Sequence, residues 1–210
     1  MFCPQAFQVT DEALCHDLIR QYPLGTLVSI SESGLEADHL PFLLTQVKGE
    51  YFLQSHIAKS NPLWKNVAEK AKVLVAFQGP QHYISPQYYA TKQETGKAVP
   101  TWNYAVVHVR GNIVFVQDPL WLRQVLEALT AVHEQTQTHP WSLADAPPAY
   151  IEKMLSAIVG IQIPIASLEG KWKLSQNQPE KNRLGVIQGL TCENTPTALQ
   201  MAAWIKQQDY

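Results

Sequence analysis

The sequence of 210 residues contains few charged side chains and almost no surplus of either sign. Charged residues make up 16% of the chain, against roughly 25% in an average soluble domain. The 16 Lys and Arg nearly balance the 18 Asp and Glu, and the net charge is −2. Nucleic-acid-binding domains usually carry a clear positive excess. We therefore expect binding to DNA to be weak or indirect.

Cysteines and long apolar runs are also scarce. The three cysteines, Cys3, Cys15 and Cys192, form no CxxC pair, which favours a reducing compartment over a disulfide framework. No stretch approaches the roughly 18 apolar residues of a membrane-spanning helix. The first residues, MFCPQAF, show no basic segment followed by an apolar run. These observations predict a cytoplasmic protein without a membrane span.

The common motifs of catalytic and phosphate-binding sites are absent. The chain contains no HExxH, GxSxG, GxxxxGK[ST] or GxGxxG. No two of its seven histidines have the i, i+4 spacing of a helical metal site. Histidines on the predicted strands are more often separate polar contacts than metal ligands, so we predict no metal site. Whether the protein is an enzyme stays open.

Apolar and aromatic residues are plentiful by contrast. Hydrophobic residues form 46% of the chain and aromatic residues 10%, enough for a sizeable core. A chain with many aromatic residues and few charged ones favours a large interface or a pocket for a planar ligand. Fourteen prolines indicate many short segments with defined turns.

Hydrophobic periodicity predicts an α+β fold with a mostly antiparallel sheet, and the aliphatic content favours a closed barrel. Strands are expected at 25–30, 39–44, 51–55, 72–77, 82–85, 104–109, 112–116 and 159–165, with strand character returning up to 174. Helices are expected at 11–22, 61–71, 120–137 and 147–157 and in a helical C-terminal end from about 180. Residues 91–101 are polar and are interpreted as a loop.

The segment SHIAKSNP, residues 55–62, is the first candidate anion site. It joins the end of a predicted strand to the N-terminus of a predicted helix, where free backbone N–H groups attract anions. His56, Lys59 and Ser60 add side-chain donors, and Asn61 is expected to cap the helix. The alternative is an ordinary capped helix with a solvated lysine.

The segment GKWKLSQN, residues 170–177, is the second candidate. Alternation along a strand would place Lys171, Lys173 and Ser175 on one face, where a row of donors suits an anionic ligand. The alternative is a solvated strand edge that lysines protect from aggregation.

Two segments rich in proline and aromatic residues, 79–86 and 99–104, form the third candidate. They flank one loop and include Trp102. They could form a wall against a flat ring, or equally a dimer contact.

Several of these motifs occur together in a known family. The segments HIAKSNPLW at 56–64, VPTWNYAVVHVRG at 99–111, IVGIQIPIASLEGKWKLSQN at 158–177 and NRLGVIQGL at 182–190 carry the similarity. With them the sequence resembles the PaiB-type FMN-binding negative transcriptional regulators over most of its length. It departs from their pattern at Gln178, where Arg is common, and at Asn182, where Asp is common.

The resemblance implies a single domain, residues 1–210, with the split β-barrel of pyridoxamine-phosphate-oxidase-like flavoproteins and peripheral helices. It also implies a homodimer with FMN at its interface. By this resemblance the cofactor-binding residues are His56, Lys59, Ser60, Asn61, Lys173, Ser175, Gln176, Trp102 and Asn103. The phosphate is expected near the first four, with further donors from 173–176.

The function implied by the resemblance is that of a flavin-dependent regulatory or sensing homodimer. Because the fold is shared with oxidases and reductases, an FMN-dependent oxidoreductase acting on a small substrate is the alternative. A dimer that has lost its cofactor is a third reading. We find no helix-turn-helix pattern, and residues 195–208 carry Lys206 as their one cation. Direct contact of this segment with DNA would be weak.

Overall fold

The structure is a computed structural model that describes residues 1–207, and its contacts group into two compact units. The first unit comprises residues 1–18, 78–107 and the described residues from 169 onward. The second unit comprises residues 19–77 and 108–168. Three long strands, β6 (Lys72–Ile84), β7 (Thr101–Asn112) and β9 (Ile158–Lys173), contribute residues to both units.

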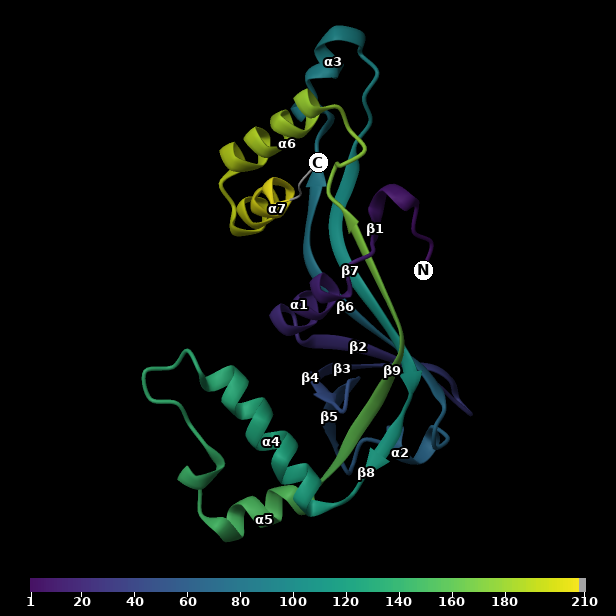
Figure 1. Cartoon of the computed structure of the whole chain (residues 1–210), viewed down its shortest axis with the longest axis vertical. Coiled ribbons are helices and arrows are strands. Elements are labelled where there is room, and N and C mark those ends of the chain that lie inside the picture. The colour runs from purple at the N-terminus through teal and green to yellow at the C-terminus, as the bar shows by residue number, and fades with distance from the viewer. Residues whose placement is uncertain (208–210) are drawn as a thin grey trace. The chain divides into compact units, whose positions relative to one another are not determined.

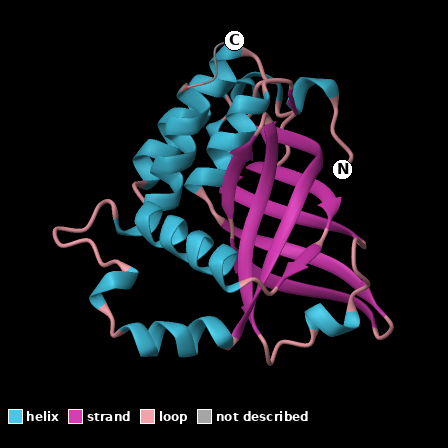
Figure 2. Cartoon of the chain, turned by 60° about the horizontal axis from the view of Figure 1, so that its bottom comes forward, coloured by secondary structure: helices cyan, strands magenta, loops and turns pink. Residues whose placement is uncertain are grey.

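The strands form one sheet in the order β3-β2-β6-β7-β9-β5-β4, with β1 and β8 also paired to β9. The other strands are β1 (Gln8–Val9), β2 (Leu24–Ser31), β3 (Gly34–Pro41), β4 (Leu43–Val47), β5 (Glu50–Ala58) and β8 (Val114–Val116). The pairs β2–β3, β2–β6, β4–β5 and β5–β9 are all antiparallel. This confirms the predicted α+β fold with an antiparallel sheet, whose strands are magenta in Figure 2.

The sheet is the curled sheet of a split barrel and not the closed barrel that the aliphatic content favoured. Its order begins at β3 and ends at β4, two strands that follow one another in the chain on either side of Phe42. Phe42 is buried and its N–H donates to the Pro23 carbonyl at 2.9 Å. The predicted strand 39–44 is therefore divided at this residue.

The second unit contains its own core and a helical hairpin. Leu27, Leu53 and Phe77 are fully buried within its part of the sheet. The helices α4 (Pro119–Glu134) and α5 (Pro148–Ser156) meet where α4 begins and α5 ends, and a segment with a 3-10 turn at Leu143–Asp145 joins their other ends (Figure 1). Their apolar faces bury a small cluster formed by Leu122, Leu143, Ile151 and Leu155.

The first unit contains the helices α3 (Ala90–Thr95), α6 (Glu180–Glu193) and α7 (Pro196–Lys206) and the 3-10 turns Gln5–Phe7 and Pro86–Tyr88. Helices α6 and α7 form a hairpin that turns at Asn194, which has a left-handed φ of 55° (Figure 1). A glycine allows α6 to approach the turn at Tyr88. A Cβ on Gly189 would lie 2.2 Å from the Tyr88 ring, so a side chain there is excluded.

The remaining helices are α1 (Glu12–Gln21) and α2 (Leu63–Asn66). The ends of α1, α4 and α5 lie within three residues of the predicted ranges 11–22, 120–137 and 147–157. No helix within residues 1–207 is long and apolar enough to span a bilayer.

The structure differs from the predicted elements in three further places. The predicted helix 61–71 is the single turn α2, because Ala71 and Lys70 exchange backbone hydrogen bonds with Ile113 and draw the chain into the sheet. The predicted strands 72–77 and 82–85 are one strand, β6. The predicted loop 91–101 begins as α3, which ends at Gly96 with a φ of 70°.

Candidate functional site

The first group of predicted ligands lies in the second unit, at the end of β5. His56 pairs with Gly160 on β9 and alternates with Ser55 and Ile57, which are buried on the other face of the strand. Its Nδ1 is buried and has no hydrogen-bond partner among the described residues. Burial lowers the pKa of His56 below its ordinary value of 6.5. The ring is therefore neutral at pH 7, and it offers a hydrogen bond rather than a charge.

The turn that follows β5 has a fixed backbone and an exposed surface. The Lys59 N–H donates to the Ala157 carbonyl at 2.8 Å, and the Lys59 carbonyl accepts from Trp64 Nε1 at 3.0 Å. The side chains of Lys59 and Ser60 are exposed. Lys59 and Ser60, which are neighbours in the sequence, therefore offer an ammonium group and a hydroxyl to solvent, and hydrogen bonds fix the Lys59 backbone.

Asn61 fixes this turn with both ends of its amide. Its Oδ1 accepts from the Leu63 N–H at 2.8 Å, and its Nδ2 donates to Asp38 Oδ1 at 2.8 Å. The predicted Asn61 bond to the start of the helix is present, but α2 begins at Leu63 with Pro62 as its N-cap and has only four residues. Such a short helix has little dipole, so the attraction for an anion rests on Lys59 and Ser60.

The second group of predicted ligands lies in the first unit, around a cavity of about 250 Å³. The cavity is lined by Tyr89, Thr91, Lys97, Ala98, Val99, Pro100, Thr101, Asn103, Lys173, Ser175, Asn177, Gln178 and Asn182. Three predicted ligands, Asn103, Lys173 and Ser175, are among them. Elements from two distant parts of the chain, 89–103 and 173–182, meet here.

Asn103 and Ser175 form the buried floor of this cavity. Asn103 is 0% exposed, and its Nδ2 donates to Ser175 Oγ at 2.9 Å. The Asn103 Oδ1 is buried and has no hydrogen-bond partner within residues 1–207. Strand β9 ends at Lys173, and Ser175 has a left-handed φ of 66°. The predicted alternation therefore does not extend to Ser175, whose side chain is directed by the turn after β9.

The cavity is positively charged. Lys97 and Lys173 line it, and Lys173 Nζ donates to Thr101 Oγ1. None of the lining residues that the structure describes is Asp or Glu. Two ammonium groups without a neighbouring carboxylate favour an anionic ligand.

Two other predicted ligands, Gln176 and Trp102, do not line this cavity. The Gln176 side chain accepts from the Leu174 N–H at 2.6 Å and donates to the Trp172 carbonyl, so both ends of its amide are used. Trp102 is 48% exposed and donates to Gln81 Oε1 at 2.7 Å.

Lys171 does not belong to a row of ligand donors, as the predicted alternation had it. Only 9% of the residue is exposed, and its ammonium group lies 5.2 Å from the centre of the Tyr104 ring. It also donates to the Phe2 carbonyl at 3.2 Å. These contacts make Lys171 a structural residue.

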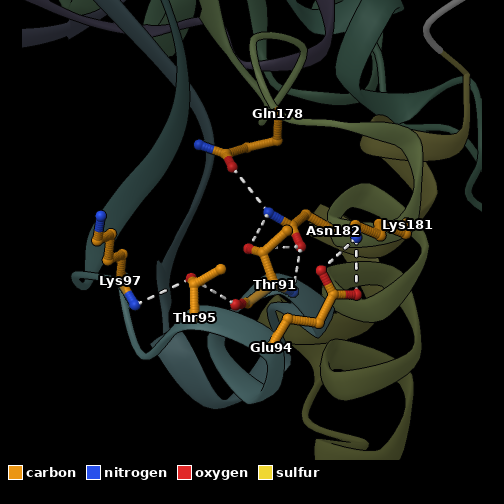
Figure 3. A network of polar contacts seen from close by, with 7 residues as sticks. All are labelled: Thr91, Glu94, Thr95, Lys97, Gln178, Lys181 and Asn182. Carbon is orange, nitrogen blue, oxygen red and sulfur yellow. Dashed lines mark hydrogen bonds and ion pairs between the residues drawn. The ribbon is translucent and has the colours of Figure 1, made fainter.

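A network of amide and hydroxyl groups joins three of the lining residues, Thr91, Gln178 and Asn182 (Figure 3). Asn182 is buried, accepts from the Thr91 N–H at 3.1 Å, and donates to Gln178 Oε1 at 3.1 Å. Beside it, Lys181 and Glu94 form an exposed ion pair at 2.6 Å. The network joins α3 to α6.

Sequence reasoning missed Thr91 and Lys97 in the cavity lining, and it named Gln178 and Asn182 only as departures from the family pattern. Gln178 lies just before α6 and Asn182 in its first turn, so their closeness in the sequence was the available signal for this pair. Thr91 lies 91 positions before Asn182, and nothing local in the sequence connects them.

The donors present suit the phosphate end of a flavin nucleotide. In the second unit, Lys59 offers a positive charge and Ser60 offers a hydroxyl group. In the first unit, Lys97 and Lys173 supply positive charge and Thr101 supplies a hydroxyl group. A cavity of about 250 Å³ is smaller than the roughly 300–1,000 Å³ of typical small-molecule sites. It has room for a phosphate and part of a polyol chain, but not for a complete flavin nucleotide. Within residues 1–207, no group of three or more His, Cys, Asp or Glu is placed to hold a metal ion.

Comparison with known proteins finds a family model and a relative that each match most of the chain. The family model described as "Putative FMN-binding domain" matches residues 1–167. The chain is 32% identical over 205 residues to the protease synthase and sporulation protein PAI 2 of Bacillus subtilis (strain 168), covering 96% of this chain and 95% of that protein.

Two solved structures show the same fold at low sequence identity. The FAD and heme binding protein of Mycobacterium smegmatis superposes with a TM-score of 0.59 at 19% identity, over 79% of this chain and 73% of that one. The flavocytochrome Anf3 of Azotobacter vinelandii superposes with a TM-score of 0.60 at 13% identity, over 79% and 69%.

Proposed function

Because the chain belongs to this FMN-binding domain family, with FMN as its cofactor, we propose that it acts as a flavin-dependent regulatory or sensing homodimer. The observation that carries the proposal is the similarity along nearly the whole chain to PAI 2, a protein named for protease synthesis and sporulation.

In this proposal the turn after β5 binds the FMN phosphate. Lys59 supplies the positive charge and Ser60 a hydroxyl, while the neutral His56 ring contributes a hydrogen bond. Asn61 is a positioning residue, because its amide is used by Leu63 and Asp38. The exposed lysine loses little solvation when it meets a phosphate, which favours binding.

In the proposed homodimer, the second group would add donors to the FMN that the partner copy binds. Lys173, Ser175 and Asn103 present an ammonium group, a hydroxyl and an amide to one cavity. Gln176 would act through the backbone that it holds at Leu174. The bound flavin supplies the redox chemistry; the chain supplies binding and orientation.

Exposed apolar residues support the homodimer. Ile30 and Leu35 are cross-strand partners on β2 and β3, with 67% and 77% of each residue exposed. Strand β3 ends the order of the sheet. A second copy that covered this hairpin would bury both side chains.

An FMN-dependent oxidoreductase is the second candidate. Trp102 and Tyr83 are 48% and 45% exposed and meet edge to face, with ring centres 6.1 Å apart. Such a pair could stack on an isoalloxazine and leave its other face open to a substrate. A steady-state assay for flavin reduction by NADH or NADPH distinguishes the two candidates, because a sensor turns over slowly or not at all.

Titration with FMN tests the proposed ligands. Charge-assisted hydrogen bonds contribute about 1.5–3 kcal/mol each, so Lys173→Ala and Lys59→Ala should each weaken FMN about ten- to a hundredfold. His56→Ala should also lower the affinity. Lys72→Ala, which removes an exposed lysine at the start of β6, is the matched control. Affinities equal to the parent in all three ligand variants would move the FMN site elsewhere.

A further inference from the structure

Helix α6 approaches the end of β6 closely, within the first unit. The 3-10 turn Pro86–Tyr88 follows β6, and two glycines one turn apart on α6 let the helix lie against it. A Cβ on Gly185 would lie 2.1 Å from the Tyr88 carbonyl oxygen, and a Cβ on Gly189 would lie 2.2 Å from the Tyr88 ring. This approach brings Glu193, the last residue of α6, to the side chains of His82 and Tyr88.

The Glu193 carboxylate receives contacts from three side chains. His82 Nε2 lies 3.2 Å from its Oε1, and the Tyr88 hydroxyl donates to its Oε2 at 3.2 Å. The Thr195 hydroxyl donates to Oε1 at 3.4 Å. Burial, and after it the hydrogen bond to Glu193, raises the pKa of Tyr88, so the tyrosine keeps its proton and remains a donor. Only 13% of the His82 side chain is exposed, which limits the competition from water.

The His82 ring faces an acceptor at each of its two nitrogens. Nδ1 lies 2.7 Å from the Tyr83 carbonyl oxygen, and Nε2 faces the Glu193 carboxylate. A carbonyl and a carboxylate only accept hydrogen bonds, whereas a neutral imidazole carries a single N–H. The neutral ring therefore satisfies one neighbour and turns a lone pair towards the other. The imidazolium donates to both.

The titratable groups around this contact favour a positive ring. Glu193 and Cys192 come from α6, Tyr88 from the 3-10 turn, and Tyr83 from β6 itself. Each of these groups is either neutral or negative, so the charges they carry attract an imidazolium. Histidine is the side chain that ordinarily changes its charge between about pH 5 and pH 8. The contact is therefore sensitive to protons in the physiological range.

We propose that His82, Glu193 and Tyr88 form a proton-dependent latch that holds the α6–α7 hairpin on β6. The protonated ring donates to the Tyr83 carbonyl and to Glu193, and the latch is closed. Loss of the Nε2 proton removes the bond to the carboxylate and leaves α6 held by Tyr88 and by packing. The latch lies next to the Tyr83 ring, which meets Trp102 edge to face. The inference goes beyond the proposed function and does not rest on it, because it follows from these contacts alone.

Hydrogen exchange of the α6 amides, followed by mass spectrometry on the full chain at about pH 5.5 and about pH 8, tests the latch. Protection corrected for the intrinsic exchange rate reports the opening of the helix. The ratio of protection at the lower pH to that at the higher pH should be about two- to fivefold larger in the parent than in His82→Gln, because half-exposed ion pairs are weak. Comparison with this variant cancels the contributions of other histidines. His139→Gln, which replaces an exposed histidine of the second unit, should keep the parental ratio.

Two further variants separate the latch from a purely structural role. Glu193→Gln should lower the ratio to that of His82→Gln, because the ring then has no carboxylate partner. Tyr88→Phe should lower protection at both pH values and keep the parental ratio, because the tyrosine remains protonated throughout this range. A thermal melt of each variant checks that it is folded. A parental ratio equal to that of His82→Gln, or a Glu193→Gln ratio equal to the parental one, would overturn the proposal. FMN enters none of these measurements, so failure of the proposed function would leave their result standing.

Discussion

Replacing Asn61 with alanine tests whether this residue holds the turn or binds the cofactor. The substitution removes the acceptor for the Leu63 N–H, and the loss of such a capping contact costs about 1 kcal/mol. It also removes the donor to Asp38 at 2.8 Å, which adds about 0.5–1 kcal/mol because water replaces part of this half-exposed bond. We expect the free energy of unfolding of the flavin-free protein to fall by about 1–2 kcal/mol.

Urea unfolding of the flavin-free protein measures this change. The midpoint should fall while the slope is unchanged, because the surface exposed on unfolding is the same. The melting temperature should drop by about 2–4 °C for each kcal/mol in a chain of this size. Ser60→Ala, an exposed neighbour, should stay within about 0.5 kcal/mol of the parent. An Asn61→Ala protein with parental stability and lost FMN affinity would show that Asn61 is a ligand instead.

Four other predictions follow from the same structure and composition. Gly189→Ala would place a Cβ 2.2 Å from the Tyr88 ring and should cost about 1–3 kcal/mol in urea unfolding; parental stability would contradict the close approach. Because burial lowers the folded-state pKa of His56, the unfolded chain takes up this proton first as the pH falls. Stability should therefore decrease below about pH 6.5, by at most about 1.4 kcal/mol per pH unit, and His56→Gln should remove this component. Sedimentation at micromolar concentration should give about twice 23.6 kDa, and a monomer would refute the dimer. DNA binding by the isolated protein should be weak and salt-sensitive, and nanomolar sequence-selective binding at about 150 mM salt would contradict this.

Local signals in the sequence were enough to predict most elements. The proline at the first position of α4 and of α7, each after a capping side chain, marks where these helices begin. The strands expected at 25–30 and 51–55 lie within β2 and β5, where buried residues alternate with more exposed ones. These features depend on neighbours within a few residues, which a sequence displays directly.

Elements decided by tertiary contacts were predicted less well. The segment after Asn61 has helical caps and composition, yet backbone bonds between Ala71 and Ile113 end the helix early. Gly79 and Pro80 look like a turn, but β6 runs through them as one strand. In both places pairing in the sheet overrides local preference.

The candidate site shows the same division. Lys173 and Ser175 were recognised from their motif, and the structure places both at a cavity. Lys97, Thr91 and Asn182 were not, because the cavity forms only when α3 and α6 come together. The unpaired oxygen of Asn103 is likewise a property of the folded chain.

The most direct test of the account compares FMN with riboflavin, which has the same ring and ribityl chain but no phosphate. Binding of each to the flavin-free protein is followed by quenching of flavin fluorescence. We predict that FMN binds at least ten- to a hundredfold more tightly, since one charge-assisted hydrogen bond to the phosphate already contributes about 1.5–3 kcal/mol. Equal affinity for the two flavins, or no binding of FMN, would contradict a site built around the phosphate.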